Sequence, residues 1–178
     1  MSELTIGVDP GQQGALAVLT SSGTVECVAD LPVIRDRSLA WIDGAELQSI
    51  LLAALRGRTA RAIVERVSAM PKQGVASSFA FGVAFGSILS VLQAMHVSIE
   101  LVTPSTWKRA LGLSSDKRAS LDRARLLFPT ADLSRAKDHG RAEALLIAHC
   151  AMTRAGGGSH AGDSSPTTGP LQSSSHGS

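Results

Sequence analysis

The sequence lacks the features that would indicate a membrane, secreted or cysteine-based metal-binding protein. Its two cysteines, Cys27 and Cys150, lie far apart and match no zinc-ligand spacing, so we expect free thiols in a reducing compartment. No positively charged segment precedes an apolar leader, and no apolar run approaches the ~20 residues of a membrane span. We therefore expect a soluble protein that is cytoplasmic or nucleoid-associated, or organellar if a transit peptide has been removed.

A large excess of charge is also missing. The net charge is only +2 over 178 residues, too small to indicate a polyanionic partner by itself. Its distribution is uneven, because residues 108–125 carry a local charge of +4 from Lys108, Arg109, Lys117, Arg118, Arg123 and Arg125 against Asp116 and Asp122. A patch of this size is typical of nucleic-acid binders, although an ordinary solvated helix face explains it equally well.

The length suits one domain, and the composition, 44% hydrophobic and 18% charged, is that of a globular protein. Residues 155–178 are rich in Gly and Ser and bury too little apolar surface to fold, so we expect a disordered tail after a folded domain of residues 1–154.

Hydrophobic periodicity and turn residues predict five strands and five helices. Three strands in hairpin succession followed by βαβ units predict an α/β fold, with a mixed sheet flanked by helices. Ser78 and Ser115 are candidate helix N-caps, and residues 31–38 show no regular pattern. The expected strands are 4–9, 14–19, 24–29, 61–65 and 97–102, and the expected helices are 45–55, 79–95, 105–111, 115–128 and 139–152.

Three acidic residues stand in apolar settings on separate elements. Asp9 ends the first strand before a Pro-Gly turn, Glu65 ends a later strand, and Glu143 lies in the first turn of the last helix. One such acid is usually a cap or an ion-pair partner, but three together favour a site for Mg²⁺ or Mn²⁺. Two such ions ~3.5–4 Å apart catalyse phosphodiester cleavage.

Asp138 and His139 are further candidates for this site. His139 lies four residues before Glu143, so both share a helix face, whereas Asp138 is nearer the helix cap. Instead of joining the metal site, Asp138 could be a helix cap and His139 a surface histidine. The sequence does not choose between these roles.

The helix expected at Phe79–Met95 is apolar nearly all round, so we expect it to be buried on more than one side. Gly82 and Gly86 would allow another backbone to approach closely. That partner is either the protein's own sheet or a second subunit.

Four stretches together resemble the RuvC-type Holliday junction resolvases of the RNase H-like superfamily, especially their phage-type and organelle-type branches. The resemblance runs from Thr5 to Cys150 and lies in IGVDPGQQGALAVL, AIVERVSAMPKQGVASSFAFGVAFG, VTPSTWKRALGL and KDHGRAEALLIAHC. It implies an RNase H-like five-stranded mixed sheet flanked by helices. It also implies a homodimeric endonuclease, dimerised through the Phe79–Met95 helix, that resolves four-way DNA junctions by paired symmetric nicks. The implied cofactor is Mg²⁺, with Mn²⁺ as substitute and two ions per active site.

The same resemblance implies a role for individual residues. Asp9, Glu65 and Glu143 match the acidic positions of the family, and the remaining ligand is either His139 or Asp138. The DNA-binding positions are Lys72, Gln73, Lys108, Arg109, Lys117 and Arg118. An aromatic wedge found in some members is absent, because Ser68, Ala69 and Met70 stand there, so the cut-site preference stays open.

Three other functions are alternatives. An actin-like or sugar-kinase-like ATPase would need a second phosphate loop, for which 178 residues leave no room. A non-catalytic junction or RNA binder would have no reason to keep Asp9, Glu65 and Glu143. Another RNase H-like nuclease, such as a transposase domain, would usually bring additional DNA-binding domains.

Overall fold

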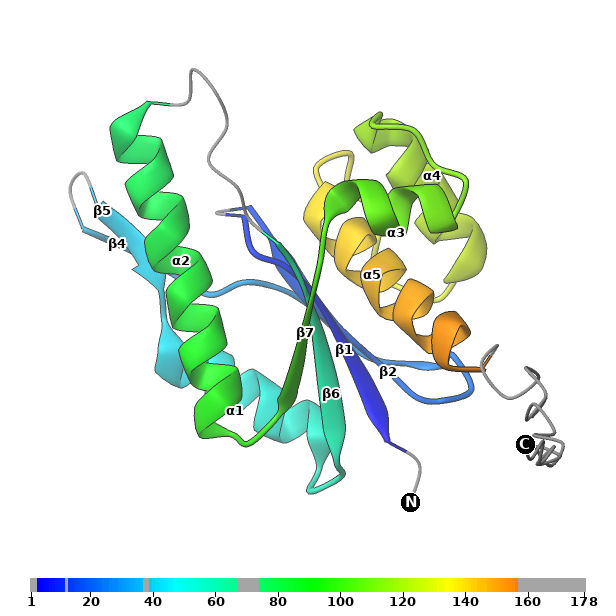
Figure 1. The fold of residues 1–178 in the computed structure, drawn as a ribbon, viewed down its shortest axis with the longest axis horizontal. Helices are drawn as coiled ribbons and strands as arrows, with labels where there is room; N and C mark the ends of the chain where they lie inside the picture. The colour runs from blue at the N-terminus through cyan, green and yellow to red at the C-terminus, as the bar shows by residue number, and fades with distance from the viewer. Residues whose placement is uncertain (1–2, 12, 37–38, 67–73, 157–178) are drawn as a thin grey trace, which may run out of the picture.

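The computed structural model describes residues 3–11, 13–36, 39–66 and 74–156. A five-stranded sheet of order β3-β2-β1-β6-β7 forms the centre, and helices cover both of its faces (Figure 1). The helices α1 and α2 lie on one face, while α3, α4 and α5 lie on the other. The predicted mixed five-stranded sheet flanked by helices is confirmed.

The sheet strands are β1 (Leu4–Asp9), β2 (Ala15–Leu19), β3 (Val25–Asp30), β6 (Ala60–Glu65) and β7 (Ser98–Val102). The central strand β1 pairs antiparallel with β2 and parallel with β6, and β6 pairs parallel with β7. The helices are α1 (Gly44–Leu55), α2 (Val75–Ala94), α3 (Pro104–Ala110), α4 (Lys117–Leu127) and α5 (His139–Gly156).

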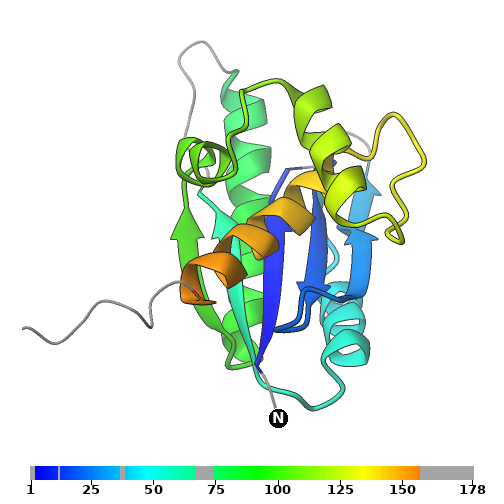
Figure 2. The same ribbon diagram turned by 90° about the vertical axis from the view of Figure 1, so that its right-hand side faces the viewer.

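Alternation along β1 assigns its side chains to two separate cores. Ile6 and Val8 pack with buried residues of α1 and α2, such as Leu47 and Ile88. Gly7 lies on the opposite face, where a Cβ atom would collide with the Ala144 carbonyl of α5. The glycine therefore lets α5 lie directly against the central strand, and Figure 2 shows α5 crossing that face of the sheet.

One hairpin was not predicted from the sequence, and two helix N-caps differ from the prediction. Residues 31–38 showed no regular pattern, yet they contribute to an antiparallel pair of β4 (Val33–Asp36) and β5 (Leu39–Ile42). α2 begins four residues earlier than expected with Gly74 as its N-cap, so Ser78 is inside the helix. α4 is capped by the Asp116 carboxylate, which accepts from the Arg118 N–H, instead of by Ser115.

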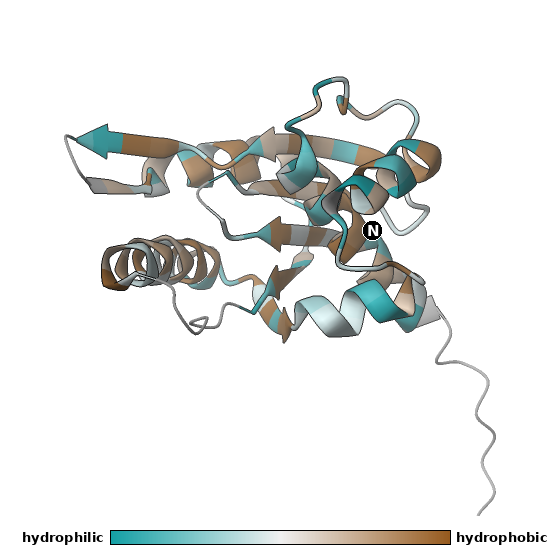
Figure 3. Ribbon diagram, turned by 90° about the horizontal axis from the view of Figure 1, so that it is seen from above, coloured by the Kyte–Doolittle hydropathy of each residue, from teal (hydrophilic) through white to brown (hydrophobic). Residues whose placement is uncertain are grey.

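The most apolar helix, α2, buries only one stripe, formed by Ala84, Ile88 and Leu92. Val75 and Phe79 are 88% and 64% exposed. The expected burial on more than one side is therefore not provided by this chain alone, and Figure 3 shows the hydrophobic helix at the edge of the molecule. Contrary to the expectation from sequence, α2 is long and apolar enough to span a membrane by length and composition.

The last helix, α5, continues through Gly156, two residues into the segment expected to form the tail. Residues 157–178 lie outside the described part of the chain.

Candidate active site at the ends of β1 and β6

The register of the parallel pair β1–β6 brings Asp9 and Glu65 to the same edge of the sheet. Val8 is paired with Val64, so Asp9 and Glu65 follow as the last residues of two neighbouring strands. Both occupy the alternation positions that face α5, because Val8 and Val64 point into the opposite core. Neighbouring strands are ~4.8 Å apart, which is within reach of a shared ligand.

Close packing of α5 adds Glu143 to this edge. The Cα positions of Gly7 and Gly140 have no room for a side chain, because the Ala144 carbonyl and the Gln13 carbonyl lie where their Cβ atoms would be. The first turns of α5 therefore rest on the ends of β1 and β2. Glu143, only 9% exposed, lies in these turns.

Trp107 and Lys108 of α3 each bind one of these acids. The Trp107 indole Nε1 donates to Glu65 Oε2 at 2.7 Å, and the indole is completely buried. Lys108 Nζ lies 2.8 Å from Glu143 Oε1, with 16% and 11% of the two side chains exposed. The Lys108 ammonium also lies 5.1 Å from the centre of the Trp107 ring.

Burial raises the pKa of the Glu65 carboxyl above its usual range. The negative charge of Glu143 also raises this pKa, while the Trp107 hydrogen bond and the charge of Lys108 act in the opposite direction. The charges of Glu65 and Glu143 therefore interact at this edge of the sheet.

Asp9 is half-buried at the end of β1. Its Oδ1 accepts the Gly11 backbone N–H at 3.2 Å, so the carboxylate also closes the turn that follows the strand. Asp9 therefore stabilises the turn, and its role as a metal ligand stays a prediction.

Asp138 and His139 are held differently. The Asp138 side chain is fully buried and accepts from the Arg135 backbone N–H at 2.7 Å and from Arg135 Nε at 2.6 Å. His139 lies in a groove of about 520 Å³ that α4 lines with Arg118 and Arg125. Within the described residues, its buried Nδ1 has no hydrogen-bond partner.

The acidic groups suit a hard divalent cation in their chemistry. Asp9, Glu65 and Glu143 offer only oxygen atoms, which Mg²⁺ and Mn²⁺ prefer. In residues 3–11, 13–36, 39–66 and 74–156, no three acidic, histidine or cysteine side chains are grouped tightly enough to form a ready-made metal site. The negative charge of Glu143 acts on Glu65, so a cation bound between them would interact with both carboxylates.

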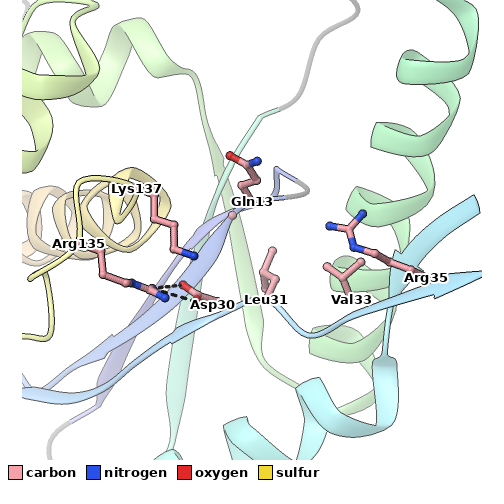
Figure 4. Close-up of a pocket in the computed structure, with 8 residues that line it drawn as sticks. Gln13, Asp30, Leu31, Val33, Arg35, Arg135 and Lys137 are labelled. Carbon is pink, nitrogen blue, oxygen red and sulfur yellow. Dashed lines mark hydrogen bonds and ion pairs between the residues drawn. The ribbon is translucent and has the colours of Figure 1, made fainter.

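Cations also surround this edge of the sheet. Arg109 and Arg118 are exposed on α3 and α4. On the other side, a pocket of about 300 Å³ lies between β4 and the loop before α5, and Figure 4 shows Lys137 and Arg35 on its opposite walls. Asp30 in this pocket is already paired with Arg135 and Arg141. The predicted DNA-binding residues Lys72 and Gln73, and the side chain of Lys117, lie outside the described part.

Trp107 is the site residue that sequence reasoning missed. A buried tryptophan packs a core in most proteins, but its N–H needs an acceptor there, and that requirement is the available signal. Trp107 is 42 residues from Glu65 in the chain, so the sequence gave no indication that Glu65 supplies the acceptor.

Comparisons with known proteins found similar structures and a similar sequence. The structure superposes on Thermus thermophilus RuvC in complex with Holliday junction substrate with a TM-score of 0.60 and 20% identity, over 87% of this chain and 96% of RuvC. A second Thermus thermophilus RuvC structure gives 0.53 and 19%, over 86% and 96% of the two chains. In sequence, the chain is 33% identical over 151 residues to the chloroplastic Holliday junction resolvase MOC1 of Chlamydomonas reinhardtii, covering 71% of this chain.

The chain is thus similar in sequence to a Holliday junction resolvase and similar in fold to RuvC. Its fold is the RNase H-like fold of RuvC, as the sequence resemblance implied. The aligned region covers only 17% of the length of MOC1. No protein-family model matches the sequence.

Proposed function

We propose that this chain is a Mg²⁺-dependent endonuclease that cuts four-way DNA junctions. The observation that supports this most strongly is the convergence of Asp9, Glu65 and Glu143 from three elements on one edge of a RuvC fold. The names of the relatives, a resolvase and a RuvC bound to a Holliday junction, point to the same substrate.

In the proposed mechanism, Asp9, Glu65 and Glu143 would hold Mg²⁺, or Mn²⁺ in its place. The chemistry that such an ion would supply is activation of a water and stabilisation of the charge on the cleaved phosphate. The strand ends and the close packing of α5 hold the acids on rigid elements. Lys108 balances the charge of Glu143 in the structure, and we propose that it contacts the phosphate backbone when that charge is neutralised.

The fourth member of the site is Asp138 or His139. Asp138 is paired with Arg135 in the same manner as Glu143 is paired with Lys108, so the ion pair alone does not separate the candidates. Asp138→Ala and His139→Ala separate them, because loss of the true fourth member abolishes nicking and loss of the other does not. Equal, mild losses would contradict both assignments.

The DNA strand is proposed to follow the cations on either side of the acids. Lys108, Arg109, Lys117 and Arg118 belong to α3 and α4, and Lys72 and Gln73, outside the described residues, are proposed to contribute as well. The exposed cations Lys137 and Arg35 lie on the other side. Binding to phosphates releases counterions, so affinity for the junction should fall steeply with salt.

A second copy of the chain is proposed to cover α2, as in the expected homodimer. The exposed Val75 and Phe79 would be buried, and Gly82 and Gly86, which have nothing within 4 Å in this chain, would admit the partner helix. Paired nicks on a two-fold junction need two active sites, which a symmetric dimer supplies.

The central test compares Asp9→Asn and Glu65→Gln with the wild-type protein on a four-way junction and on linear duplex of the same sequence. Wild type should nick the junction in Mg²⁺ and leave the duplex intact, while each variant should bind the junction but not nick it. Glu46→Gln is the matched control, because this exposed acid of α1 lies outside the site. Full nicking by Asp9→Asn or Glu65→Gln would refute the proposed active site, and wild-type binding without cleavage would favour the non-catalytic junction binder.

A further inference from the structure

The path of the chain places Trp107 beside Glu65. Glu65 is paired with Val102 in the parallel β6–β7 register, so β7 ends next to it. Thr103 then caps α3, accepting the Thr106 N–H, and the helix turns back toward the sheet. One turn into α3, the indole of Trp107 meets the Glu65 carboxylate.

The contact between them is specific in geometry. The indole has one donor and no acceptor, and in a completely buried position that donor needs a partner. Its 2.7 Å distance to Glu65 Oε2 is that of a strong hydrogen bond to a charged acceptor. The bond occupies one carboxylate oxygen from a fixed direction and so restricts the rotation of a side chain that would otherwise have several rotamers.

A neutral donor suits a metal ligand better than a cation does. An arginine or lysine in this position would orient Glu65 as well, but its charge would compete with the divalent ion. The indole N–H orients the carboxylate without adding a full charge.

The same side chain also supports the second acid. Lys108, the next residue, lies 5.1 Å from the centre of the Trp107 ring and binds Glu143. A cation over an indole ring is stabilised by the ring's quadrupole. Trp107 therefore contacts Glu65 directly and also contacts Lys108, the cation that binds Glu143.

We propose that Trp107 is a positioning residue that fixes the Glu65 carboxylate for divalent-cation binding through its indole N–H. This inference rests on the proposed metal site. If Trp107 only filled the core, removal of its N–H would change the stability of the protein but leave the affinity for the metal unaltered.

The test uses the full chain and measures metal binding directly. Replacing Trp107 by benzothienylalanine exchanges the N–H for a sulfur atom and keeps the shape of the ring, so packing is preserved. Isothermal titration with Mn²⁺ and Mg²⁺ should show affinity lower by about 10- to 100-fold, the usual effect of losing a group that orients a metal ligand. Trp107→Phe should give a similar or larger loss, with thermal unfolding measured alongside to report any effect on the fold.

The composition of the chain provides a second readout. The sequence contains two tryptophans and no tyrosine, so Trp41→Phe leaves Trp107 as the only indole. We expect its fluorescence to change on addition of Mn²⁺, Mg²⁺ or Ca²⁺, with saturation at the calorimetric affinity. Trp41 lies in β5, so Trp41→Phe also serves as the matched control and should bind metal as wild type does.

The outcomes separate this inference from the proposed function. Unaltered metal affinity of the benzothienylalanine protein would overturn the role of Trp107, whether or not the wild type cuts junctions. Metal binding that depends on Trp107, in a wild type that cuts no junction, would support the positioning role and refute the nuclease. A wild type that binds no divalent ion at millimolar concentration would overturn both.

Discussion

The helices α5 and α2 are of similar length, 18 and 20 residues, and cover opposite faces of the same sheet, yet their surroundings differ. α5 is enclosed by the sheet, α3 and α4, and its buried residues run almost without interruption from Ala142 to Ala151. α2 is apolar nearly all round but buries only Ala84, Ile88 and Leu92. The enclosed helix carries the acid Glu143 into the site, whereas the open helix carries no ionisable residue and presents apolar surface to solvent.

The apolar residues of the two helices therefore have different roles. In α5, apolar packing fixes the position of the Glu143 side chain relative to the strand ends, which requires contact on all sides. In α2 the apolar residues exceed what the fold of one chain buries, and exposed apolar patches of this kind mark sites of association. Substitutions at matched positions on the two helices should therefore have different effects.

The largest contrast is expected from adding one methyl group under α5, in β1, and one on the exposed side of α2. Gly7→Ala should destabilise the protein by about 3 kcal/mol, because the new Cβ would meet the Ala144 carbonyl and lie 2.6 Å from the Ala148 backbone nitrogen. Gly82→Ala, with nothing within 4 Å, should stabilise it by about 0.5–1 kcal/mol through helix propensity. Urea denaturation at low protein concentration measures both, and equal effects would contradict the close packing of α5.

The second contrast concerns association. Phe79→Glu places a charge on the exposed face of α2 and should convert a dimer into a monomer while leaving the stability of the monomer nearly unchanged. Sedimentation velocity at micromolar concentration, without detergent, measures the change. Leu52→Glu is the control, because Leu52 of α1 is similarly exposed, at 58%, but lies outside the proposed interface. A monomeric wild type would refute the dimer, and flotation of the wild type with lipid vesicles would assign α2 to a membrane instead.

The same contrast explains how far the sequence predicted the structure. The five sheet strands and the five helices were predicted because their apolar spacing reflects burial on a sheet or along a helix face. The β4–β5 hairpin was missed because only part of it is buried and its alternation is short. For α2 the periodicity gave the helix, but an all-apolar sequence does not say which side meets the sheet.

In the site, the carboxylates Asp9 and Glu65 were identifiable because strand ends are local features, and parallel strands end at one edge. The contacts of Trp107 and Arg135 were not, since they depend on how α3 and the loop before α5 fold back over the sheet. The contact of Lys108 with phosphate stays a prediction, and its ion pair with Glu143 was not foreseen.

The smallest effect is expected from lowering the pH, through protonation of a histidine in α5. Burial lowers the pKa of the His149 imidazole below its usual value, and the positive charge of Arg123 lowers it further. The folded protein therefore favours neutral His149, whose ring packs edge-on against Phe128 at 5.7 Å. The unfolded chain binds the proton more readily, so this contribution to stability is present above the unfolded pKa near 6.5 and is lost as the pH falls below it.

Urea denaturation between pH 5 and 8 measures this contribution. Wild type should lose stability toward pH 5, and His149→Gln should remove the part of the loss that begins near pH 6.5. Asp30, whose pKa is lowered by Arg141 and Arg135, adds nothing to this loss, because its stabilisation is lost only as the pH falls below the unfolded value of 3.8. His96→Gln is the control, because His96 lies in the turn after α2, away from the core of α5. If His149→Gln and His96→Gln gave the same pH profile, the buried imidazole would not be the source. A difference confined to His149→Gln would identify the buried imidazole of α5 as the group whose protonation lowers the stability of the protein.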